Sequence, residues 1–211
     1  MVQNVNEDPL QLNSWLLGLM YCFLFLLIII VKHQVVISDY QLETEYVGSD
    51  FENYLSVTNT FRLLKYLFLT IGFSFSIFIN AIILSGLNFY YNSNMSKTEL
   101  INLAIFSSSA ILLREITIIT YFIFREDFIS TEVFNFDPFS VYSLLGWQKE
   151  DIKYSLVILT QSIDIFLLIK GMIIFWGIKK LSDLDLRKQL LIAFTFFIPY
   201  LIFWIFLHLL I

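Results

Sequence analysis

The segment Lys153–Lys180, KYSLVILTQSIDIFLLIKGMIIFWGIKK, is long and apolar enough to cross a bilayer, yet it carries charged and amide side chains. These are Gln161, Asp164 and Lys170. A carboxylate in the hydrocarbon core costs about 3 kcal/mol or more, so it needs a partner or a water-filled cavity. We therefore expect the rest of the chain to supply a partner for Asp164.

The composition indicates a membrane protein. Hydrophobic residues make up 58% of the chain and charged residues 15%, whereas about a quarter of an ordinary soluble domain is charged. The net charge of −5, without a cluster of basic residues, argues against a nucleic-acid partner. Cys22 is the single cysteine, which excludes an intramolecular disulfide and a cysteine-based metal site.

Five segments have the length of a bilayer crossing, which takes about 20 mostly apolar residues. We predict an all-α, polytopic transmembrane helix bundle that forms a single membrane domain over residues 1–211. Its spans are expected at about 15–31, 66–87, 100–124, 154–178 and 190–210. The first span has no polar face and is expected at the lipid-facing edge.

Two longer connections separate these spans. Residues 33–62 are expected to form a polar, solvated loop with one amphipathic helix before Tyr66. Residues 125–152 are rich in aromatic side chains, which is typical of a segment in the headgroup region. A re-entrant hairpin is the alternative for this second connection.

Polar residues also interrupt the second and third spans. Gly72, Ser76 and Asn80 share one face of the second helix, a pattern typical of close helix packing. Arg114 and Glu115 stand near the middle of the third span, and their side chains point about 100° apart. At least one of these two charges therefore needs a partner from another helix.

A comparison of depths predicts which groups meet. If each residue rises about 1.5 Å, Asp164 and Arg114 lie about 21 and 22 Å from the side that holds the loop between spans four and five. Lys170 and Asn80 lie about 12 and 10 Å from the same side. We therefore predict an Arg114–Asp164 ion pair, with Gln161 and Thr117 completing its hydrogen bonds, and a second level that holds Lys170 and Asn80.

The orientation follows from loop charges. Lys179, Lys180, Arg187 and Lys188 lie close together between spans four and five, and short basic loops stay in the cytoplasm. This predicts a cytoplasmic N-terminus, although the basic residues after the first span favour the reverse.

Three short stretches in the C-terminal part resemble bacterial members of the Yip1 family of multispanning membrane proteins. They are Pro138-Phe139-Ser140-Val141 with Leu144-Leu145, Ser162-Ile163-Asp164-Ile165-Phe166, and Trp176-Gly177-Ile178-Lys179-Lys180. The resemblance implies a non-enzymatic protein of the bacterial cytoplasmic (inner) membrane. Eukaryotic members interact with small GTPases in vesicle traffic, but no residue for such binding is carried over to this chain.

Two functions remain in view. No Ser/His/Asp set, paired histidines or phosphate-binding glycine loop indicates an enzyme, and no cofactor or metal is expected. The first function is a scaffold that binds other membrane proteins or itself in the bilayer. The alternative is a small transporter or channel subunit that uses Arg114, Asp164 and Lys170 as a polar path. The candidate site is an intramembrane polar cluster: Asn80, Arg114, Glu115, Gln161, Asp164 and Lys170.

Overall fold

A computed structural model of the chain describes residues 13–35, 49–125, 139–140, 143 and 163–210. Nearly all of this part is helical, and no strand occurs in it, which confirms the predicted all-α class. The helices are α1 (Ser14–Val35), α3 (Ser49–Tyr91), α4 (Lys97–Ser107), α5 (Ser109–Ile123), α9 (Ile165–Leu181) and α10 (Leu186–Leu210).

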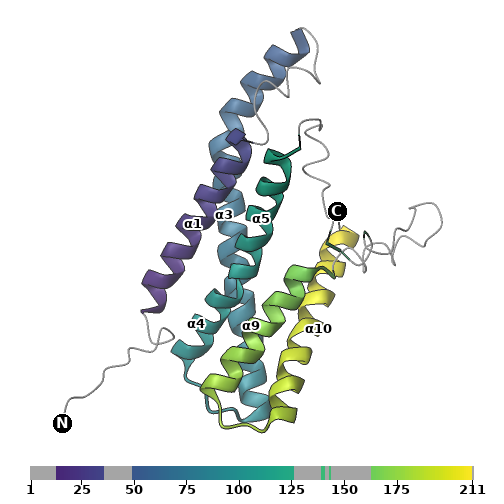
Figure 1. Cartoon of the computed structure of the whole chain (residues 1–211). Helices are drawn as coiled ribbons and strands as arrows, with labels where there is room; N and C mark the ends of the chain where they lie inside the picture. Colours follow the sequence, from purple (N-terminus) through teal and green to yellow (C-terminus); the bar gives the residue numbers. More distant parts are fainter. Residues whose placement is uncertain (1–12, 36–48, 126–138, 141–142, 144–162, 211) are drawn as a thin grey trace.

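The helices form one elongated bundle in which α4 and α5 follow each other along a central line (Figure 1). On one side α1 packs against α3, α4 and α5, and on the other α9 packs against α4, α5 and α10. Helix α10 also contacts α3. Successive long elements run in opposite directions, as expected for a chain that crosses a layer repeatedly (Figure 1).

Three helices are long and apolar enough to cross a membrane, as expected for an integral membrane protein. They cover Ser14–Gln34, Leu64–Tyr91 and Lys97–Ile123, close to the first three predicted spans. Helix α9 has 17 residues and is about 25 Å long, compared with about 30 Å of hydrocarbon in a typical bilayer. The candidate spans found among the described residues do not include those predicted over 154–178 and 190–210, which stay predictions, and residues 154–162 lie outside the described part.

The polar connection over 33–62 differs from the prediction. Helix α1 continues to Val35, and residues 49–62 form the first turns of α3, a single helix of 43 residues. Between Ser49 and Ile71 the chain has no glycine or proline to end a helix. The predicted polar helix therefore runs directly into the second span, and its beginning extends beyond α1 and α5 (Figure 1).

The third span is interrupted at Ser108, between α4 and α5. The hydroxyls of Ser107 and Ser108 both donate to the Ala104 carbonyl, at 2.8 and 3.0 Å, and that of Ser109 donates to the Phe106 carbonyl at 2.7 Å. Serine hydroxyls that bond back onto the preceding turn compete with the helix ladder and bend the helix. The three consecutive serines therefore account for the break.

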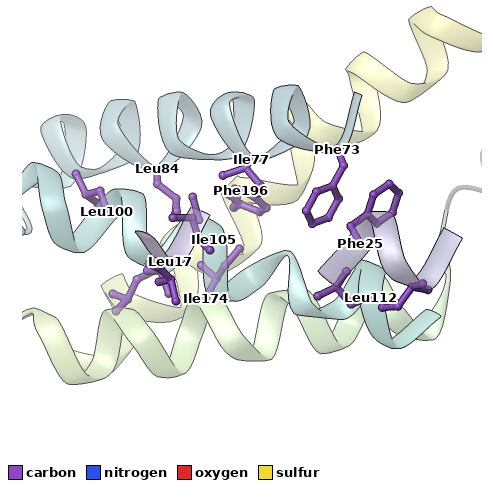
Figure 2. Packing of buried hydrophobic residues seen from close by; sticks show 14 of the residues in the cluster. Leu17, Phe25, Phe73, Ile77, Leu84, Leu100, Ile105, Leu112, Ile174 and Phe196 are labelled. Atoms are coloured by element: carbon purple, nitrogen blue, oxygen red, sulfur yellow. The ribbon is translucent and has the colours of Figure 1, made fainter. Parts of the chain in front are cut away.

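The buried core lies along α4 and the facing sides of its neighbours (Figure 2). Leu103, Ile105 and Ile174 are almost fully buried, and the rings of Phe25 and Phe73 stack with centroids 4.3 Å apart. The faces of α1 and α3 that point away from the bundle instead expose large apolar side chains, as lipid-facing surfaces do. This agrees with the expected place of the first span at the lipid-facing edge.

Close packing uses glycines other than the one the sequence pattern indicated. Asn80 is buried, but a Cβ added at Gly72 would have no neighbour within 4 Å. A Cβ at Gly171 would overlap the Phe197 ring, and one at Gly177 would overlap the Leu103 side chain. Gly171 and Gly177 therefore let α9 approach α10 and α4.

Replacing Gly177 by alanine should destabilise the bundle by about 1–3 kcal/mol, because the new methyl group overfills a packed core. The Leu103 side chain that it meets is 1% exposed and has little room to move. Thermal unfolding in detergent, followed by far-ultraviolet circular dichroism, measures the effect.

Gly86→Ala is the matched control, because a Cβ there has no neighbour within 4 Å. It should leave the unfolding temperature unchanged or raise it, because alanine favours a helix more than glycine does. Equal destabilisation by both substitutions would contradict the close approach of α9 and α4.

Candidate functional site

Asp164 begins helix α9 and does not lie inside it. Its backbone is extended, at φ −122° and ψ 170°, and its carboxylate oxygen Oδ1 accepts a hydrogen bond from the Leu167 N–H at 2.6 Å. This N-cap corrects the predicted span, which places Asp164 within a helical face that includes Gln161. Gln161 itself lies outside the described residues.

A short piece of the aromatic connection covers this end of α9. The Phe139 carbonyl accepts from the Ile165 N–H at 3.2 Å, and Ser140 forms an isolated β-bridge with Asp164. Ser140 is completely buried, and the Phe139 ring lies edge-on to Phe166 with centroids 5.7 Å apart. The first N–H groups of a helix have no partner within the helix, and here the Phe139 carbonyl satisfies one of them.

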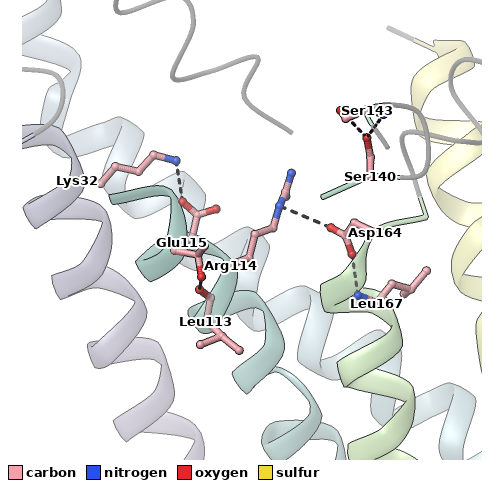
Figure 3. Close-up of polar contacts among 9 residues, drawn as sticks. Lys32, Leu113, Arg114, Glu115, Ser140, Ser143, Asp164 and Leu167 are labelled. Carbon is pink, nitrogen blue, oxygen red and sulfur yellow. Dashed lines mark hydrogen bonds and ion pairs between the residues drawn. The ribbon is translucent and has the colours of Figure 1, made fainter. Parts of the chain in front are cut away.

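The predicted contact between Arg114 and Asp164 is present. The Arg114 Nε lies 3.7 Å from the Asp164 Oδ2 (Figure 3). One carboxylate oxygen of Asp164 therefore faces Arg114 of α5, and the other accepts the N–H of Leu167 in α9. The Arg114 side chain is 39% exposed, which indicates a charge near the rim of the bundle. Thr117 was expected to support this pair, but its hydroxyl donates to the Leu113 carbonyl within α5.

The outside partner of Glu115 is Lys32 at the end of α1. The Lys32 Nζ lies 2.7 Å from the Glu115 Oε2, and both side chains are about 15% exposed (Figure 3). The sequence reasoning missed this pair because it placed Lys32 at the boundary of the first span. The depth of the two residues along their helices could have predicted the pair. Lys32 and Glu115 each follow the start of their span by 18 residues, about 27 Å.

The second predicted level brings Lys170 and Asn80 together. The Lys170 Nζ donates to the Asn80 Oδ1 at 3.1 Å and lies 5.4 Å from the centre of the Phe196 ring. Asn80 is fully buried and Lys170 is 2% exposed. The hydrogen bond between α9 and α3 therefore lies in the core, where α10 contributes the Phe196 ring beside the amine. Within the described part of the chain, the Asn80 Nδ2 has no hydrogen-bond acceptor.

Three contacts that involve a charged side chain thus link different helices at two depths. Lys32–Glu115 joins α1 to α5, Arg114–Asp164 joins α5 to α9, and Lys170–Asn80 joins α9 to α3. No group of three or more metal-ligating His, Cys, Asp or Glu side chains occurs among the described residues. The arrangement can hold four helices, α1, α3, α5 and α9, in register, and Lys170 adds an amine inside the core.

No protein-family model matches the chain, and neither the curated proteins nor the solved structures give a significant match.

The two roles of Asp164 can be separated by substitution. Asp164→Asn removes the charge that faces Arg114 but keeps a side-chain oxygen for the Leu167 N–H, so it should lower the unfolding temperature modestly. Asp164→Ala removes the cap as well and should cost about 1 kcal/mol more. Thermal unfolding of the purified protein in detergent measures both.

Exchanging the charges, with Arg114→Asp and Asp164→Arg together, tests the pair itself. The double variant should recover part of the stability lost in Arg114→Asp alone, because opposite charges face each other again. A double variant no more stable than either single one would contradict the ion pair.

Lys170 and Asn80 should show strong coupling in a double-mutant cycle. Asn80→Leu leaves a buried ammonium without its amide acceptor and should cost about 1–3 kcal/mol. Lys170→Met together with Asn80→Leu replaces the polar contact by apolar groups and should restore most of that loss. Additive effects in thermal unfolding would contradict the contact.

Proposed function

We propose that this chain is a non-enzymatic, multispanning membrane protein that acts as a scaffold or interaction partner within a membrane complex. It resembles Yip1-domain proteins, and we place it in a bacterial cytoplasmic membrane with a cytoplasmic N-terminus. Its partners are the lipid bilayer and other membrane proteins, or further copies of itself.

One observation carries this proposal: the polar groups at membrane depth contact each other between helices. A transport path needs polar groups that continue from one face of the membrane to the other. Lys32–Glu115, Arg114–Asp164 and Lys170–Asn80 each join two different helices instead. Such contacts support a role in fixing helix positions.

The outer faces support the same role. Helix α3 exposes a row of apolar side chains, including Phe68, Ile71, Phe75, Phe78 and Ile82. In lipid the hydrophobic effect does not drive helices together. Such faces instead associate through van der Waals packing between complementary surfaces, as in complexes of membrane helices. They give the protein a large surface for neighbouring membrane proteins.

Lys170 favours the second candidate, a small transporter or channel subunit. Its amine lies in the core, six residues along α9 from Asp164, which is about 9 Å. Arg114, Asp164 and Lys170 would then be steps of one polar path. This path needs further helices, supplied by other copies or partners.

Purification in a mild detergent distinguishes the two functions. The scaffold proposal predicts that other membrane proteins copurify at stoichiometric amounts, and that Lys170→Met retains them. It also predicts no ion flux above that of empty liposomes. Purification as a discrete oligomer alone, with ion flux abolished by Lys170→Met, would contradict it and support the transporter.

A further inference from the structure

The turn between α9 and α10 exposes a dense group of cations. Lys179 and Lys180 end α9, Arg187 and Lys188 begin α10, and all four side chains are exposed. The turn has two exposed acids, Asp183 and Asp185. Four positive charges therefore face two negative ones, and the surface is cationic.

The turn is held in one conformation by its own side chains. The Ser182 hydroxyl donates to the Ile178 carbonyl at 2.7 Å, and the buried Gln189 amide donates to the Leu184 carbonyl at 2.7 Å. The Asp185 carboxylate accepts from the Lys188 N–H at 3.0 Å, so this acid caps the start of α10. The four basic side chains therefore extend from a backbone that these hydrogen bonds hold in place.

Apolar surface adjoins these charges on both helices. Trp176 is 55% exposed, one turn before Lys180, whose Nζ lies 5.7 Å from the centre of the indole. Met172, Leu186 and Leu190 are also exposed. An exposed tryptophan beside basic residues at the end of an apolar helix is typical of the membrane–water interface.

We propose that the α9–α10 turn binds the headgroups of anionic phospholipids in the leaflet that surrounds it. The four cations match the phosphates, while Trp176 and its apolar neighbours match the acyl chains beneath them. A soluble acidic partner would fit the cations alone and leave this apolar surface in water. A layer of anionic lipid contacts the cations with its headgroups and the apolar side chains with its acyl chains.

The test uses Trp176 as the sole tryptophan of the full chain, after Trp15→Phe, Trp147→Phe and Trp204→Phe. The protein is reconstituted in phosphatidylcholine vesicles that contain either brominated phosphatidylglycerol or brominated phosphatidylcholine as quencher. Quenching of Trp176 then gives the relative association of the two lipids with this turn. We expect a preference of about fivefold for phosphatidylglycerol, the effect of about one basic residue at an anionic surface.

The preference should fall to nearly one when Lys179, Lys180, Arg187 and Lys188 are all replaced by glutamine. It should also weaken in about 1 M salt, where screening acts within about 3 Å. Lys179→Arg with Lys180→Arg keeps the charge and should keep the preference. Lys97→Gln, an exposed cation at the same end but on α4, should leave it unchanged.

Equal quenching by the two lipids in the parent protein would overturn the proposal, and so would a preference that survives the fourfold glutamine variant. Native mass spectrometry of the chain with all four tryptophans gives a second readout that does not depend on the replacements. It should find phosphatidylglycerol retained by the parent protein and lost from the fourfold variant. Retention by both would overturn the proposal equally.

Discussion

The start of α9 depends on one constraint: buried backbone N–H groups and charges must find partners inside the protein. Asp164 satisfies both kinds of group, because one carboxylate oxygen accepts a backbone N–H at the start of α9 and the other faces the charge of Arg114 in α5. Phe139 and Ser140 satisfy and bury the adjoining backbone. Lys170 lies six residues further along the helix that these contacts begin.

Depth along a helix made much of the candidate site predictable. Because the α-helix rises uniformly, residue counts from one membrane side placed Arg114 beside Asp164 and Lys170 beside Asn80, and both contacts are present. The same count would have found Lys32 and Glu115, had the first span been extended past Val31. The helix class and the first three spans were predictable from apolar length alone.

The parts that were not predictable depend on contacts between distant segments. An apolar run does not reveal that α9 begins at Ile165, since this requires the extended Asp164 and the strand-like pairing with Ser140. Nor does the spacing of small residues distinguish Gly72, which has no neighbour, from Gly177, which meets Leu103. In α3 the predicted amphipathic helix before Tyr66 was expected to be separate from the second span, but no glycine or proline ends it and the two form one helix.

The most direct test is the chemical accessibility of position 140. In a Cys22→Ser background, Ser140→Cys should react slowly with a small, membrane-permeant maleimide, because Ser140 is completely buried against the end of α9. Adding Asp164→Ala should make it react much faster, while Lys97→Cys, an exposed position, reacts quickly in either case. Rapid labelling of Ser140→Cys in the presence of Asp164 would contradict the burial of Ser140 against the start of α9 and the pairing of Ser140 with Asp164.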